Sequence, residues 1–144
     1  MADLLRELVE HVAALTGLRI GGGSASNADD RLYAGHAPPD KPDLAAVVRE
    51  IGGPDQLLTA DAARVGRPTF QVLTRGPTFF AARDLAWLVH DALHGAAWED
   101  LGDHTLHVAE ALARPAQLGF DDRGRHLLSA SYVVAAHDQS LATP

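Results

Sequence analysis

The sequence predicts an α+β fold, in which an antiparallel (mixed) β-sheet is flanked by two main α-helices in a single domain over residues 1–144. The chain is 47% hydrophobic and 22% charged, a composition that suits one hydrophobic core. Apolar residues recur at helical spacing in 3–17 and 78–95. Runs rich in β-branched and aromatic residues, 68–75 and 125–137, predict strands.

The first helix has a residue suited to each end. Asp3 can accept free backbone N–H groups of the opening turn, and Gly17 ends the helix. Residues 21–30 are rich in Gly, Ser, Asn and Asp and predict a flexible loop. Their three glycines do not make the Gly-x-Gly-x-x-Gly phosphate motif, because Ser26 stands where its third glycine would be.

Three short segments come next. Residues 31–34 predict an edge strand before a proline cluster. Residues 44–53 fit either a helix begun by Asp43 or a strand, and their Val-Val-Arg-Glu-Ile core favours the strand. Residues 56–66 have a mixed pattern and predict a flexible loop that joins two strands.

The second half begins with the clearest elements. Residues 68–75 predict a strand with Phe70 and Val72 on one face. A long helix follows, begun by the hydroxyl of Thr78 and ended by Gly95. The last third predicts two antiparallel strands, 105–112 and 125–137, around an Asp/Gly-rich turn at 119–124, and a frayed tail at 138–144.

The helix at 78–95 is apolar around most of its circumference. A domain of this size has few layers with which to bury such a helix on two sides. We therefore expect part of its surface, with Phe79, Phe80 and Trp87, to pack against another subunit.

Composition excludes several function classes. The chain contains no cysteine, which rules out disulfides, a thiolate nucleophile and cysteine metal sites. Its formal net charge of −7 argues against a basic patch for nucleic acid or anionic lipid. The N-terminus resembles neither a signal peptide nor a membrane span, so we expect synthesis in a cytoplasm and no membrane partner.

Two histidines offer a candidate metal site. His90 and His94 share one helix face, with Asp91 where a zinc peptidase would have its glutamate. A catalytic zinc site needs a third protein ligand, for which the candidates are His104, His107 and Glu110. Histidines near a helix C-terminus are also favoured by the helix dipole alone, and we expect neither a metal nor a cofactor.

Other catalytic patterns have little support. Asp121 and Asp122 could be paired carboxylates, but a tight turn favours such residues for backbone reasons. Ser129 and Ser131 lie in a strand pattern without the sharp glycine turn of a serine hydrolase. We expect no catalytic residues, and therefore a protein that is not an enzyme.

A resemblance to a known family emerges from the order of local motifs. These are Gly52-Gly53-Pro54, the Pro-x-x-Gln-Val-x-x-Arg strand at 68–75, an Ala-rich helix, the turn Leu118–Arg125 and the segment Ser129–Tyr132. Over residues 40–137 this order is similar to that of the minor capsid or tail terminator proteins of long-tailed bacteriophages. The loops at 21–30 and 56–66 are not part of the likeness.

The resemblance implies a structural virion protein. Such a terminator forms a homo-oligomeric ring, commonly of six subunits, that caps the tail tube, stops its polymerisation and joins tail to head. The implied partners are further copies of the chain, the tail tube protein and the head–tail connector protein, with DNA only as cargo passing through the lumen. Its implied location is the head–tail junction of the virion.

Three alternatives remain at this point. A head–tail connector or tail-completion protein of similar size would look much the same. A metal-dependent hydrolase would use His90 and His94 and would carry zinc. A dimeric binding module would use Phe79, Phe80 and Trp87 at a two-fold interface and would never form a ring.

Overall fold

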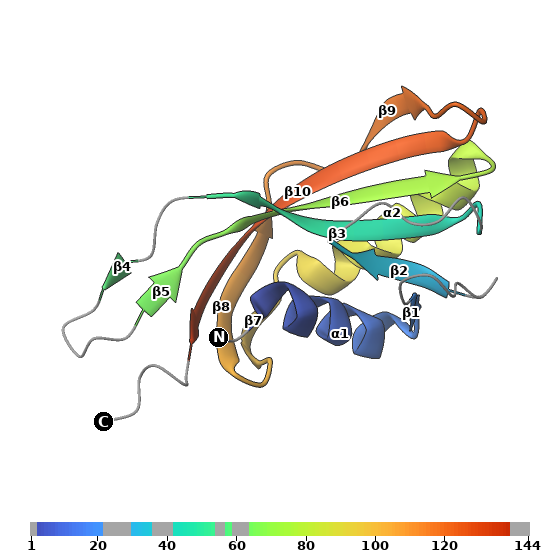
Figure 1. Cartoon of the computed structure of the whole chain (residues 1–144). Helices are drawn as coiled ribbons and strands as arrows, with labels where there is room; N and C mark the ends of the chain where they lie inside the picture. The colour runs from blue at the N-terminus through green and yellow to red at the C-terminus, as the bar shows by residue number, and fades with distance from the viewer. Residues whose placement is uncertain (1–2, 22–29, 36–41, 54–56, 59–63, 139–144) are drawn as a thin grey trace.

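The structure, a computed structural model, describes residues 3–21, 30–35, 42–53, 57–58 and 64–138 (Figure 1). Two helices pack beside a twisted, mixed β-sheet, as predicted. The helices are α1 (Leu4–Thr16) and α2 (Phe79–Leu93). The strands are β1 (Arg19–Ile20), β2 (Asp30–Ala34), β3 (Ala45–Gly52), β4 (Leu57–Leu58), β5 (Arg64–Gly66), β6 (Thr69–Gly76), β7 (Ala97–Asp100), β8 (His104–Ala111), β9 (Ala116–Phe120) and β10 (His126–Asp138).

The long strand β10 organises the sheet. Its first half lies between β6 and β9, which gives the strand order β1-β2-β3-β6-β10-β9. Its second half pairs with β8 on one side and with β5 on the other. Strand β7 pairs in turn with β8, and β4 pairs with β5. The β1–β2 and β2–β3 pairs are parallel, whereas the remaining pairs are antiparallel. Within the described residues, β9 therefore forms an outer edge of the sheet.

Both predicted helices are present. In α1 the backbone N–H of Arg6 donates to the Asp3 carboxylate at 3.1 Å, and Gly17 ends the helix with φ 74°. In α2 the N–H of Ala81 donates to the Thr78 hydroxyl at 3.2 Å. The cap at the end of α2 is His94, one residue before the predicted Gly95, which adopts the left-handed conformation with φ 84°.

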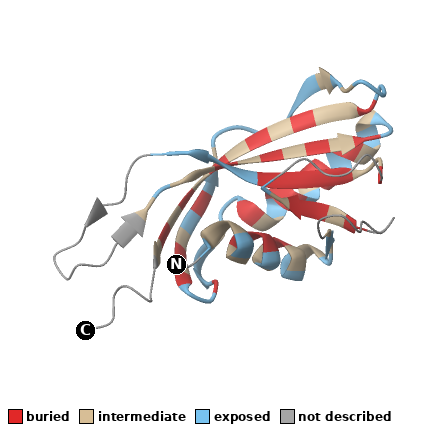
Figure 2. Ribbon diagram, in the orientation of Figure 1, coloured by how far each residue is buried: buried red, intermediate tan, exposed pale blue. Residues whose placement is uncertain are grey.

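The core lies between the helices and one face of the sheet. Strand β6 alternates along its length, with Phe70, Val72 and Thr74 buried, as the pattern predicts (Figure 2). The same core contains Val48 of β3 and Tyr132 of β10. The buried sides of both helices pack into this core, with Leu8, Val9 and Val12 of α1 and Leu85, Val89 and Leu93 of α2.

Several sequence predictions need correction. Residues 31–34 do form a strand, but it is not an edge strand, because β1 pairs with it on the side away from β3. The predicted loop 56–66 contains β4 and β5, which are stabilised by pairing with each other and with β10 rather than by their own pattern. Of the predicted loop 21–30, Asp30 already belongs to β2. Residues 22–29, 54–56, 59–63 and 139–144, with most of the predicted tail, lie outside the described residues.

Two other predictions are confirmed with changes. Residues 44–53 form the strand β3 rather than a helix. Strands β8 and β10 are antiparallel neighbours, as expected for 105–112 and 125–137. The turn at 119–124, however, joins β9 to β10, so β9 is the hairpin partner across that turn.

Candidate functional site

The outer surface of α2 and the neighbouring strand β9 carry a concentration of exposed apolar side chains. Phe80 is 67% exposed, and Phe120 at the end of β9 is 63% exposed. Leu88 of α2 and Leu118 of β9 are also exposed. We call the surface made by these side chains and Trp87 the α2–β9 edge.

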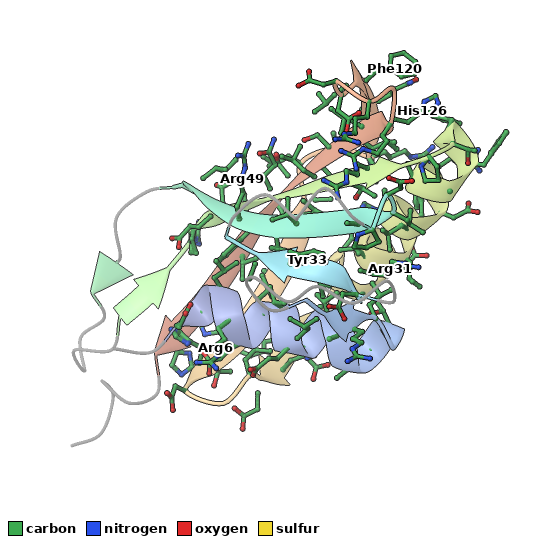
Figure 3. All side chains as sticks on the ribbon, turned by 45° about the vertical axis from the view of Figure 1, so that its right-hand side comes forward. Arg6, Arg31, Tyr33, Arg49, Phe120 and His126 are labelled. Atoms are coloured by element: carbon green, nitrogen blue, oxygen red, sulfur yellow. The ribbon has the colours of Figure 1, made fainter. Side chains whose placement is uncertain are left out.

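One end of the α2–β9 edge is an aromatic cluster. The rings of Phe79 and Phe80 meet edge to face at 5.5 Å between centroids, and Phe79 also contacts His126 at 6.2 Å. His126 in turn lies 4.7 Å from the ring of Phe120, and the labels of these two residues stand together at the top of the molecule in Figure 3. The guanidinium of Arg83 lies 5.9 Å from the Phe80 ring. The cluster joins the start of α2 to the β9–β10 turn.

The other end of this edge is hollowed. A hollow of ≈ 480 Å³ lies between the C-terminal half of α2, the end of β8 and the segment that follows β8. We call it the Trp87 hollow. Its lining residues are Trp87, His90, Asp91, His94, Ala111, Ala113 and Arg114. Trp87 is half-buried and packs edge to face on His90, with centroids 4.8 Å apart. The hollow therefore has an apolar wall, with charges of both signs beside it.

His90 connects the hollow to the core. Its Nδ1 shares a hydrogen bond of 2.9 Å with the hydroxyl of Tyr132, which is fully buried. Burial lowers the pKa of His90 below its ordinary value, and the neighbouring His94 lowers it further. Burial also raises the pKa of the Tyr132 hydroxyl, so that this group stays protonated. At neutral pH the pair is therefore an uncharged hydrogen bond beneath the hollow.

The geometry of His94 does not favour a metal ligand. The backbone N–H of Ala111 donates to Nδ1 of His94 at 3.0 Å, so Nδ1 carries no proton and the neutral ring holds its proton on Nε2. A metal needs a free nitrogen lone pair, and His94 offers none while this bond is made.

The predicted third ligands lie elsewhere. His104 pairs with Glu7 of α1, and His107 shares a hydrogen bond of 2.7 Å with His137. Across the part of the chain that the structure describes, no group of three His, Asp or Glu side chains is placed to hold a metal ion.

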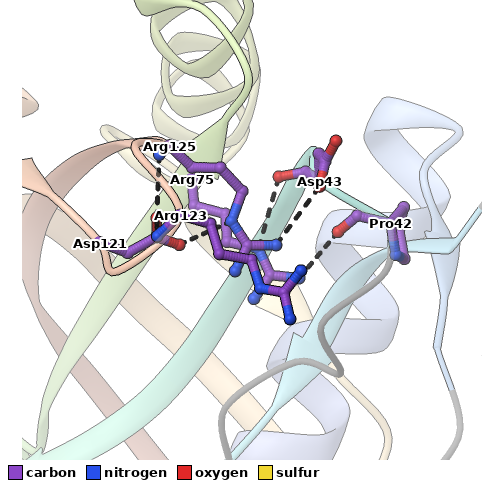
Figure 4. A network of polar contacts seen from close by, with 6 residues as sticks. All are labelled: Pro42, Asp43, Arg75, Asp121, Arg123 and Arg125. Carbon is purple, nitrogen blue, oxygen red and sulfur yellow. Dashed lines mark hydrogen bonds and ion pairs between the residues drawn. The ribbon is translucent and has the colours of Figure 1, made fainter.

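The carboxylate of Asp121 has a structural role in the β9–β10 turn. It accepts the backbone N–H groups of Arg123 and Arg125, and the Arg125 side chain donates to it at 2.6 Å (Figure 4). Arg125 also reaches Asp43, two residues before β3, at 3.4 Å. Desolvation acts to raise the pKa of Asp121, but the hydrogen bonds from Arg125 and Arg123 outweigh it, and the pKa lies below its usual range. Of the two neighbouring carboxylates, Asp121 and Asp122, Asp121 therefore has the backbone role expected in a tight turn. It fixes the end of β9.

The chain matches a known protein family over most of its length. The family model of the bacteriophage tail terminator protein matches residues 23–138, which is most of the chain. The chain belongs to this family. The match includes the whole span, 40–137, over which the sequence motifs resemble tail terminators.

A solved structure shows the same fold. A chain in the virion of a native gene transfer agent particle superposes with a TM-score of 0.50 and 20% sequence identity. The match covers 93% of this chain and 90% of that chain. No curated protein sequence matches significantly. As a tail terminator family member, the protein is a structural component of a phage-type virion.

The predicted interface residues of this tail terminator family member fall at two places. Phe79 and Phe80 lie together in the aromatic cluster, whereas Trp87 lines the hollow, two turns further along α2. Leu118 and Phe120 were not among the predicted interface residues, although their alternation before the Asp/Gly turn is a strand signal. No helix in the described part of the chain is long and apolar enough to cross a membrane.

Proposed function

We propose that the protein is a tail terminator that assembles, with further copies of itself, into a ring of six subunits on the end of the tail tube. The ring stops tube polymerisation by occupying the growing end, and its other face binds the head–tail connector protein. This places it at the head–tail junction of the virion. Family membership supports the tail role, and the α2–β9 edge supports the association between copies.

The exposed apolar side chains of the α2–β9 edge are the observation that best supports the proposed ring. Soluble monomers rarely expose large contiguous apolar patches, and those that do usually bind another protein there. Phe80, Leu118 and Phe120 remain exposed although the sheet and α2 bury a full core. A closed ring needs two different patches on each subunit, one of which the α2–β9 edge supplies.

The net charge suits a ring that surrounds DNA. The chain carries a formal net charge of −7. Like charge keeps phosphate groups from binding the lumen, so that DNA passes without being held.

The test is a polymerisation assay with the tail tube protein of the same particle. Purified protein added to growing tubes should stop elongation, and electron microscopy should show shorter tubes with one capped end. The Phe80→Glu variant should leave tube growth unchecked, and Ile51→Glu, which alters an exposed apolar residue of β3, should act like the wild type. Tubes that grow equally long with and without the wild-type protein would overturn termination, and binding to the connector alone would favour a connector role.

A further inference from the structure

Strand β7 presents the second tryptophan of the chain, which is exposed on the face of the sheet away from the helices. Trp98 is 75% exposed, and its φ of 52° lies in the left-handed region that side chains other than glycine rarely adopt. Its ring lies 5.0 Å from that of His107 on the adjacent strand. His107 follows the core residue Leu106 in β8, so its side chain projects from the opposite face of the sheet.

The surroundings of Trp98 are acidic. The β7–β8 hairpin, residues 97–111, contains Glu99, Asp100, Asp103 and Glu110 and no lysine or arginine. Glu99 and Asp103 are exposed. An aromatic residue beside acidic groups fits a surface that offers an apolar recess with a cation at its rim.

The Trp87 hollow has these properties. Its volume of ≈ 480 Å³ and its Trp87, Ala111 and Ala113 walls leave space for a large aromatic side chain. Arg114 lines the hollow and is exposed. It forms no ion pair or hydrogen bond with any described residue. The hollow thus combines an aromatic wall with the cation of Arg114, and the carboxylate of Asp91 lines it as well.

We propose that Trp98 of one copy inserts into the Trp87 hollow of the next copy. Glu99 pairs with Leu106 and so projects from the other face of β7, which is an edge strand among those described, and it reaches Arg114 around this edge. This inference rests on the proposed function, because it supplies the second patch of the ring contact. Trp98 lies on the sheet face away from the helices and the hollow lies beside α2, so the two patches differ and the contact is heterologous. Repetition of such a contact closes into a ring when the rotation between copies is suitable.

A charge swap tests the pairing directly. Arg114→Glu and Glu99→Arg should each weaken association between copies by about tenfold or more, because each places like charges together. The double variant should recover most of the lost association, since the pair is then restored with its signs exchanged. Both residues are exposed, so the variants should fold normally, and mass measurements by analytical ultracentrifugation would follow the assembly.

A variant of the aromatic anchor separates assembly from folding. Trp98→Asn should lose association between copies while its free energy of unfolding stays equal or rises, because asparagine tolerates the left-handed conformation. Leu15→Asn, at another exposed apolar site, on α1, is the control and should assemble normally.

The outcomes distinguish this contact from the ring itself. If Trp98→Asn and Arg114→Glu assemble like the wild type, or if the double charge swap does not recover, the Trp98 contact is wrong while the ring stands. If the wild type itself never associates, the proposed ring fails, and the contact fails with it.

Discussion

At the residue scale, His90 makes stability depend on pH. Its pKa is lowered in the folded protein, chiefly by burial and then by His94, while Asp91 opposes and Arg114 adds to the shift. The unfolded chain, with an ordinary histidine pKa of 6.5, therefore binds a proton more readily than the folded chain as the pH falls. Stability should be full above that pKa and should decrease as the pH drops below it.

The corresponding prediction compares two variants. Between about pH 7.5 and about pH 5.5, the urea midpoint of the wild type should fall, and His90→Gln should show a shallower dependence because one group with a shifted pKa is removed. His107, whose pKa is also lowered by burial and by His137, should retain part of the slope. Identical slopes in the two proteins would show that His90 does not contribute.

At the element scale, the contact between β6 and α2 is unusually close. A Cβ added to Gly76 would lie 2.8 Å from the backbone nitrogen of Ala82, and the backbone of the helix cannot yield cheaply. We expect Gly76→Ala to lower the free energy of unfolding by about 1–3 kcal/mol, the usual cost of overpacking. Chemical denaturation would measure it, with exposed Pro77→Ala as control, and an unchanged stability of Gly76→Ala would contradict this packing.

The exposed side of α2 should matter for assembly and not for folding. Phe80 stands in the first turn of α2, where a carboxylate is favoured by the helix dipole, so Phe80→Glu should fold at least as stably as the wild type. It should nevertheless lose association, because a charge without a partner in an interface is costly. Trp87→Glu should behave alike, with some loss of stability because Trp87 packs on His90.

Circular dichroism and solution mass would separate these effects. A Phe80→Glu protein that unfolds would show that this side chain belongs to the core of its own chain, and one that still assembles would remove Phe80 from the interface. Ile51→Glu serves as the control with the same substitution on another element.

Elements with local signals were predictable from the sequence. The caps Asp3, Gly17 and Thr78 and the alternation in 69–76 identify α1, α2 and β6 correctly. Strands β4, β5 and β7 carry no apolar alternation and depend on their neighbours, so no local pattern could reveal them. The pairing of His90 with Tyr132 joins residues 42 positions apart, and only the folded chain brings them together.

At the scale of the whole molecule, the fold offers different surfaces on its two sides. The α2–β9 edge holds exposed apolar side chains and the Trp87 hollow, while the opposite sheet face presents Trp98. A subunit with two unlike, complementary patches builds rings or filaments, whereas a self-complementary patch builds dimers. This asymmetry, together with family membership, is the physical basis of the proposed terminator ring.

The most direct test of that claim is the mass of the purified protein in solution, measured by light scattering over a range of concentrations. We expect a discrete species of ring size, several times the 15.3 kDa of one chain, which Phe80→Glu reduces to the monomer. A wild-type protein that remains a 15.3 kDa monomer at every concentration, or that stops at a strict dimer, would contradict it.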